Sequence, residues 1–331
     1  MLLRVPSKTQ HSIGKTERIS CGQRMTHRII SLIASATEIV AALGYEDSLV
    51  GRSHECDFPA SVESLPVCSE PRIDVSGSSL EIDQAVKGAV REALSVYAVF
   101  KDELQRLQPT IIITQTQCEV CAVSLKDVEA AVCELIDSQP AIVACEPMQL
   151  TDVWTDIEKV ATALDDPQAA TKLNSHLQQQ LQALKSQYAE IGTRPTIACI
   201  EWLEPLMIAG NWVPELVEIA GGKAVMSEVG KHSPYQSWDD LIANDPDVIA
   251  VMPCGFDIAR TMQELHLLTD HPGWNSLSAV QNQRVYVTDG NQYFNRPGPR
   301  VVESAEILAE IMHRDQEVFL HEGTGWMRLS Y

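Results

Sequence analysis

Short runs of apolar residues, many of them β-branched, recur along both halves of the chain, and each run is bounded by turn residues. Helix-length segments separate the runs, and strands that alternate with helices in this way are typical of parallel sheets. The second half repeats the order of the first. The runs are 28–34, 107–114 and 140–146 in the first half, and 196–202, 244–252 and 284–290 in the second. The pattern predicts two Rossmann-like α/β lobes, each with a mainly parallel sheet.

The most regular helical pattern lies between the two halves. Asp166 followed by Pro167 is a favourable helix start, and apolar residues then recur at steps of three and four up to Ile191, just before Gly192. About 25 helical residues at 1.5 Å each span roughly 37 Å, the width of a small domain. We therefore expect one long rigid helix between the lobes and a ligand cleft of nearly fixed width.

These patterns also give boundaries for the parts of the chain. They are a disordered leader at 1–25, an N-terminal lobe at 26–150, a linker at 151–192 that includes the backbone helix 167–191, a C-terminal lobe at 193–315 and a tail at 316–331.

Charge and composition exclude some classes of function. The formal net charge is −20, and no basic stripe with interleaved aromatic residues offsets it, so nucleic acid is not expected as a partner. No apolar run approaches the roughly 20 residues of a membrane-spanning helix. The segment 1–25 holds five basic residues and one acidic residue and lacks the apolar core of a secretory signal. We expect a cytoplasmic monomer whose leader is a disordered tail or an over-long start before Met25. The alternatives are a periplasmic location, if the true start differs, and an organellar one, if the leader is a transit peptide.

The loops that follow the predicted strands are the place to expect a ligand, because ligands of open α/β sheets sit outside the carboxyl ends of the strands. One such loop, "RSHECDFP" at 52–59, contains His54, and another contains Cys254. Aromatic residues are few, yet six fall in turns of the second half, which indicates a site for a bulky apolar ligand. They are Trp202, Trp212, Tyr235, Trp238, Tyr293 and Phe294, of which Trp238 and Trp212 are also candidates for loop anchors within their own lobe.

The pair Cys118 and Cys121 follows the strand at 107–114 with the spacing of a CxxC motif. Three hypotheses remain open for it: half of a zinc site completed by Cys56, His54 or Cys254, a redox pair at a helix start, or a wall of the cleft. We favour the cleft wall. Nine cysteines in a long chain do not form a disulfide framework. No nucleophile elbow or phosphate-binding loop is present, so the sequence favours a binding protein over an enzyme.

Three stretches carry a resemblance to a known family. They are "RIISLIASATEIVAALGYEDSLVGRSHECDFP", "EWLEPLMIAGNWVPELVEIAGG" and "QYFNRPGPR". Together they resemble the class III, helical-backbone substrate-binding proteins, within them the cobalamin-binding group that includes the periplasmic vitamin-binding component of the corrinoid ABC importer. The resemblance covers roughly Arg28 to His313.

The resemblance implies a site and a partner surface. It implies a corrinoid ligand, similar to cobalamin, with no separate metal, and the corrin would be contacted by apolar and aromatic groups of both lobes, with His54 also a candidate axial ligand to cobalt. It further implies docking on an ABC permease through Glu81 and Glu218, although the stretch "QAVKGAVREALSVYAVFKDEL" after Glu81 departs from the family pattern as an added helical segment. The ligand contacts expected from the resemblance and from the strand-end loops together are His54, Phe58, Cys118, Cys121, Trp202, Pro205, Tyr235, Tyr293, Phe294 and Arg296.

The function expected from the sequence is therefore binding, storage or delivery of a corrinoid, linked to ABC transport. Two alternatives remain open: a binding protein of this fold for another metal chelate such as haem or a siderophore, and a redox or zinc-dependent enzyme built on the CxxC motif.

Overall fold

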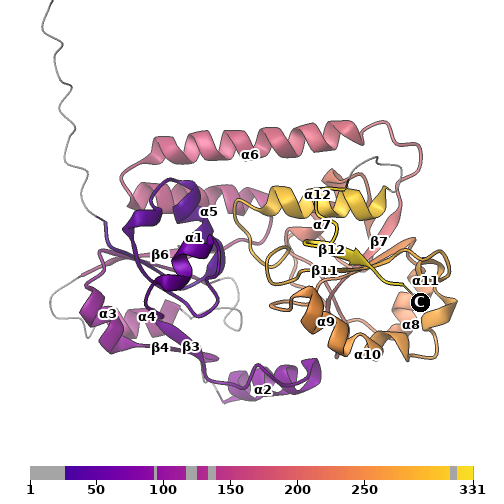
Figure 1. The fold of residues 1–331 in the computed structure, drawn as a ribbon, viewed down its shortest axis with the longest axis horizontal. Helices are drawn as coiled ribbons and strands as arrows, with labels where there is room; N and C mark the ends of the chain where they lie inside the picture. Colours follow the sequence, from indigo (N-terminus) through magenta and orange to yellow (C-terminus); the bar gives the residue numbers. More distant parts are fainter. Residues whose placement is uncertain (1–26, 93–94, 117–124, 133–138, 314–318, 331) are drawn as a thin grey trace, which may run out of the picture.

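A computed structural model of the chain shows two α/β lobes side by side, with one long helix running along the same side of both (Figure 1). The structure describes residues 27–92, 95–116, 125–132, 139–313 and 319–330. Within these ranges no helix is both long and apolar enough to cross a bilayer. The two-lobe α/β fold expected from the sequence is confirmed.

The N-terminal lobe is built on a parallel sheet in the order β2-β1-β5-β6. Its strands β1 and β5 are fully buried, as expected for strands covered by helices on both faces. The strands are β1 (Ile29–Ser31), β2 (Leu49–Arg52), β5 (Ile111–Gln115) and β6 (Ala141–Cys145); the helices are α1 (Ala34–Ala42), α3 (Lys101–Leu107), α4 (Leu125–Val132) and α5 (Leu150–Ala163), with 3₁₀ turns at Glu46–Ser48 and Ala60–Ser64.

A small antiparallel hairpin projects from this lobe and carries an inserted helix. Strand β3 (Ser69–Pro71) pairs with β4 (Tyr97–Val99), and helix α2 (Ser79–Arg91) lies between them in sequence. Ser78 and Glu81 form a reciprocal capping box that fixes the start of α2. The sequence stretch after Glu81 is thus not one added helix: it is divided among α2, β4 and α3.

The C-terminal lobe has a sheet in the order β12-β11-β10-β7-β8, with β9 paired to β7. The central strands are parallel, and β12 runs antiparallel at one edge. The strands are β7 (Thr196–Trp202), β8 (Met207–Ile208), β9 (Lys223–Ala224), β10 (Val248–Val251), β11 (Val285–Thr288) and β12 (Trp326–Arg328); the helices are α7 (Val213–Ile219), α8 (Trp238–Asn244), α9 (Ile258–Glu264), α10 (His266–Thr269), α11 (Ser278–Gln281) and α12 (Val301–Met312), with a 3₁₀ turn at Trp274–Ser276.

Helix α6 (Pro167–Gln187) is the rigid connector expected from the sequence. The Asp166 side chain accepts a hydrogen bond from the Ala169 amide at 3.2 Å and so caps its start. Its buried face packs against α5 of the N-terminal lobe and against α7 and α12 of the C-terminal lobe. One continuous hydrophobic cluster therefore includes residues of both lobes, such as Ile111 and Val248. The lobes are held at a fixed separation on this side.

Three expectations about local structure need correction. The backbone helix ends at Gln187 and not at residue 191, and the segment from Tyr188 onward turns toward β7. The expected tail at 316–331 is not separate from the C-terminal lobe where the structure describes it (319–330), because β12 pairs with β11. The spacing of Ser35 and Glu38 is that of a capping box and predicts a side-chain cap for α1, but both residues are buried inside the helix and its start has no side-chain cap.

Candidate functional site at the lobe junction

The loops that follow the parallel strands of the two lobes meet at the junction between the lobes. A buried ionic network connects them there. Glu38 of α1, in the N-terminal lobe, accepts hydrogen bonds from Arg300 (Nε to Oε2, 2.9 Å) and from Arg296 (Nη1 to Oε1, 3.3 Å) of the C-terminal lobe. All three residues are at most 7% exposed. Such a network can be stable only while every charge keeps its partner.

Asp57 extends this network from the loop after β2. It accepts from Arg296 (Nη1 to Oδ1, 2.5 Å) and from the side-chain amides of Asn291 (3.0 Å) and Gln292 (2.9 Å). Burial alone would raise the pKa of Asp57, but the hydrogen bond and charge of Arg296 lower it on balance, so the carboxylate is ionised at neutral pH. The network joins the lobes on the side of the strand ends.

Two residues expected to contact a ligand have other roles. Arg296 is 6% exposed and is occupied by Glu38 and Asp57, because two buried carboxylates face it. Phe294 is 2% exposed and packs in the hydrophobic core, whereas its neighbour Tyr293 is only half-buried. Both expectations were wrong for the same reason: the loop at 289–300 turns these two side chains into the protein, which its composition alone does not reveal.

Glu38 is the residue that sequence reasoning missed. Its place three residues after Ser35 is that of a capping-box carboxylate, which gives no sign of a partner in the other lobe. Two features of the sequence could have indicated this role. Glu38 is a carboxylate on the apolar face of a short helix, and the two arginines in "NRPGPR" had no assigned counterion.

Two further carboxylates face the junction from opposite lobes, Glu55 after β2 and Glu201 at the end of β7. Burial raises the pKa of Glu55 to about 7, against the opposing effects of Arg296 and the Tyr97 hydroxyl, and burial also raises the pKa of Glu201 to about 7. Burial is the main cause that raises the pKa of the Cys254 thiol, and the charges of Glu201 and Glu55 raise it further.

Glu55 and Cys254 are surrounded by protein atoms, but their side chains are still partly accessible to solvent. The Glu55 side chain is 39% exposed, and Cys254 is exposed although burial is the main cause that raises the pKa of its thiol. Both properties are expected of groups on facing loops between which water retains access. We call the space lined by Glu55, Glu201 and Cys254 the interlobe space.

The raised pKa of Glu201 gives a prediction about pH. Below about pH 4.5 the carboxyl is protonated in both the folded and the unfolded chain; as pH rises toward 7 the unfolded chain ionises first, which destabilises the folded state. We expect the free energy of unfolding of the wild type to fall by roughly 1–2 kcal/mol more than that of Glu201→Gln between about pH 5 and pH 8, because water access reduces the full effect of burial. Urea unfolding at several pH values measures this, and parallel curves would contradict the assignment.

His54 lies on the N-terminal side of the junction. Its Nδ1 is 3.2 Å from the Ser69 hydroxyl, its ring centroid is 5.3 Å from that of Tyr97, and its Nε2 is 3.7 Å from Glu55. Burial is the main cause that lowers its pKa, which favours the neutral imidazole. A neutral ring with Nε2 toward Glu55 has the form that a metal ligand requires, and ligation of cobalt stays a prediction.

The aromatic residues expected at the ligand separate into two groups. Trp212 is buried in the core and Trp238 stacks on His271 at 3.8 Å between ring centroids, so both are loop anchors. Trp202 is half-buried and contacts Phe256, and Tyr235 is 53% exposed. Phe58 is 41% exposed, with the guanidinium of Arg300 at 4.0 Å from its ring centroid, and Pro205 is partly exposed in the turn after β7. The second group can still contact a ligand.

The remaining candidates are placed as follows. Cys118 and Cys121 lie outside the described residues. In the part of the chain that is described, no group of three or more His, Cys, Asp or Glu side chains is arranged to hold a metal ion.

Glu81 and Glu218 are both exposed, as a docking surface would require, and the Glu81 carboxylate also accepts from the Ser78 amide at 2.8 Å.

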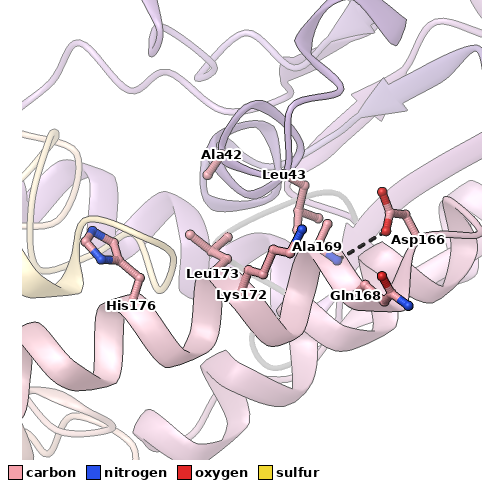
Figure 2. A pocket seen from close by; sticks show the side chains of 8 residues that line it. All are labelled: Ala42, Leu43, Asp166, Gln168, Ala169, Lys172, Leu173 and His176. Atoms are coloured by element: carbon pink, nitrogen blue, oxygen red, sulfur yellow. Dashed lines mark hydrogen bonds between the residues drawn. The ribbon is translucent and has the colours of Figure 1, made fainter. Parts of the chain in front are cut away.

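A groove of about 550 Å³ lies elsewhere, between the end of α1 and the start of α6 (Figure 2). Leu43, Leu173 and Lys172 are among the side chains that line it. Because α1 begins just after β1, its carboxyl end lies at the opposite edge of the sheet from the strand ends, where ligands of this fold bind. We therefore assign the ligand site to the junction and not to this groove.

Comparison with known proteins agrees with this architecture. A family model described as periplasmic binding protein matches residues 29–292, most of the chain. The chain belongs to the periplasmic binding protein family.

Members of this family that resemble the chain include proteins named for vitamin B12. The "Vitamin B12-binding protein" of Vibrio parahaemolyticus is 24% identical over 283 residues, which cover 84% of this chain and 86% of the relative. That of Photorhabdus laumondii is 22% identical over 293 residues, 86% of each chain. This periplasmic binding protein is thus similar along nearly its whole length to vitamin-binding relatives.

Solved structures show the same fold. The periplasmic vitamin B12 binding protein of Vibrio cholerae matches with a TM-score of 0.62 and 22% identity, over 88% of this chain and 98% of the other. A periplasmic heme binding protein of Pseudomonas aeruginosa matches with a TM-score of 0.68 and 18% identity, over 92% and 98%. The expectation of a cytoplasmic location is wrong, because the family and these relatives are periplasmic proteins, which indicates a periplasmic or extracellular location. Membership of a family of binding proteins also favours binding over catalysis.

Proposed function

We propose that this chain binds a corrinoid in the interlobe space and delivers it as the substrate-binding component of an ABC importer. The observation that carries the proposal is that loops of both lobes meet at the junction, where Glu38 and Asp57 bind Arg296 and Arg300. Trp202 and Tyr235 would contact the ligand from one lobe, and His54 and Phe58 from the other. The vitamin B12-binding relatives support this ligand class. A preformed space between lobes with a fixed separation suits a binding protein, because little order has to be created on binding.

The charges at the junction favour a corrinoid over haem or a siderophore. Haem carries two carboxylates and many siderophores are anionic, so both need free cationic groups, whereas a corrin ring carries amide side chains that donate hydrogen bonds. Arg296 and Arg300 are neutralised by Glu38 and Asp57, and the guanidinium of Arg52 donates to the backbone carbonyls of Ser53 and Glu63. Glu55 and Glu201 can accept from amides, and above their pKa of about 7 they would repel carboxylates.

Titration with cobinamide, cyanocobalamin and haemin, followed by visible absorption, tests the proposal. We expect saturable binding of at least one corrinoid, with a Kd roughly tenfold or more below that of haemin, because a like-charge contact in an enclosed space is costly. Tighter binding of haemin, or no corrinoid binding at all, would refute the corrinoid assignment.

Delivery to a permease is the second part of the proposal. Glu81 at the start of α2 and Glu218 on α7 belong to different lobes and both are exposed, as expected for carboxylates that contact basic residues of a partner. Their role in docking stays a prediction, which loss of vitamin uptake in a charge-reversed pair would test.

A further inference from the structure

Helix α2 belongs to the N-terminal lobe in sequence, but its start is bound to the C-terminal lobe. Figure 1 shows α2 on the side of the molecule opposite α6, reaching toward α9 and α10. The Ser79 amide donates to Glu264 of α9 (2.8 Å), and the Ser79 carbonyl accepts from the indole N–H of Trp202 (3.1 Å). Arg260 of α9 donates to the Gly77 carbonyl at 2.7 Å. The two lobes are thus connected through α2 at the side where α6 does not join them.

The next turns of α2 bind a second aromatic residue. The Tyr235 hydroxyl donates to Asp83 at 3.1 Å, and the Lys87 ammonium lies 4.5 Å from the centroid of the Tyr235 ring. Trp202 and Tyr235 are therefore both bound by α2 in this structure. They are also the two aromatic side chains of the C-terminal lobe that the proposed function assigns to the ligand.

The contact between α2 and the C-terminal lobe is mainly polar. Within α2 only Ser79 and Ile82 are buried, so little apolar surface stabilises the docked position. The Ser79 hydroxyl is buried without a hydrogen-bond partner, which further weakens that position. A helix with few buried apolar side chains, bound through a small number of hydrogen bonds, belongs to the class of segments that open locally at low free energy.

We propose that α2 is a clasp that competes with the ligand: it closes one side of the interlobe space by binding Trp202 and Tyr235, and it must release them before a ligand can use them. This inference rests on the proposed function for the identity of the ligand. The apparent Kd then equals the intrinsic Kd divided by the fraction of molecules with α2 released. Weakening the clasp should therefore increase affinity through the association rate.

The test uses Glu264→Gln in the full chain, since Glu264 binds α2 and is not a ligand contact. Glutamine keeps the shape of the side chain but removes the charge that accepts the Ser79 and Arg260 hydrogen bonds. Stopped-flow binding of cobinamide should show an association rate constant about tenfold higher, a Kd lower by the same factor and an unchanged dissociation rate constant. Asp239→Asn, an exposed carboxylate at the start of α8, is the matched control and should leave all three unchanged.

Hydrogen exchange without ligand examines the clasp independently of the ligand's identity. The Ser79 amide and its neighbours in α2 should exchange about tenfold faster in Glu264→Gln, while amides of α8 stay unchanged. Unchanged exchange in α2 would overturn the clasp. An unchanged association rate, or equal increases in both rate constants at constant Kd, would overturn its competition with the ligand. Failure of the wild type to bind any corrinoid, with faster exchange still present in the variant, would refute the proposed function and leave the clasp standing.

Discussion

Replacing Glu38 by glutamine is expected to destabilise the folded protein by about 3–5 kcal/mol. Glu38 is 3% exposed and is the shared acceptor for Arg296 and Arg300, which are 6% and 7% exposed. Without its charge the two guanidinium groups stay buried with only Asp57 as an ionic partner, and a buried charge without a counterion carries a large desolvation penalty. The chain should unfold at a markedly lower urea concentration, measured by far-ultraviolet circular dichroism.

A Glu→Gln substitution in an exposed ion pair provides the control for the effect of burial. Glu103 forms an ion pair with Arg106 within α3, where the side chains are 34% and 59% exposed. Glu103→Gln should cost at most about 1 kcal/mol, because water solvates the arginine that is left. Equal effects of the two substitutions would show that the network at Glu38 does not hold the lobes together.

Replacing Trp202 by alanine is expected to weaken corrinoid binding by roughly 1–3 kcal/mol, a Kd increase of about five- to 150-fold. The indole is half-buried at the end of β7, 5.3 Å from Phe256 between ring centroids, so its face can lie against a flat ligand. The loss should fall toward the lower end of that range, since the variant also removes the hydrogen bond to Ser79 and so weakens the clasp. Titration followed by visible absorption measures the change.

Two variants separate the contributions of Trp202. Trp202→Phe keeps an aromatic ring and removes the N–H donor, so it should associate faster than the wild type and keep most of the affinity. Trp238→Ala removes a tryptophan that stacks on His271 inside its own lobe, and it should lower stability without changing the Kd. No loss of affinity in Trp202→Ala would make Trp202 a loop anchor as well.

The fold could be predicted to a large extent from the sequence because its signals are local and repeated. The apolar runs that became β1, β5, β7 and β10 needed no partner to be recognised as strands. The spacing of Leu173, Leu177, Leu181 and Leu184 predicted α6 because one face of an isolated helix must already be apolar to pack on two lobes. The end of α6 was misplaced because Tyr188 and Ile191 continue the apolar spacing after the helix has stopped.

The site was harder to predict because its contacts join residues far apart in the chain. Arg296 was expected to contact a ligand, and only the tertiary structure places Glu38, some 260 positions earlier, against both Arg296 and Arg300. Phe294 and Tyr293 are adjacent aromatics in one loop, yet one is buried in the core and the other is half-buried. Composition cannot separate them because the path of the loop is set by what it packs against.

The sequence by itself determined the two α/β lobes, the rigid helix between them and the edge of each sheet where a ligand would be found, since these follow from periodicity and from the direction of parallel strands. Only the tertiary structure decided which charges are neutralised at that edge and that α2 crosses to the opposite lobe. Both depend on pairings between distant segments, and the energy of a charge or a hydrogen-bond donor is set by the partner it meets in the folded chain.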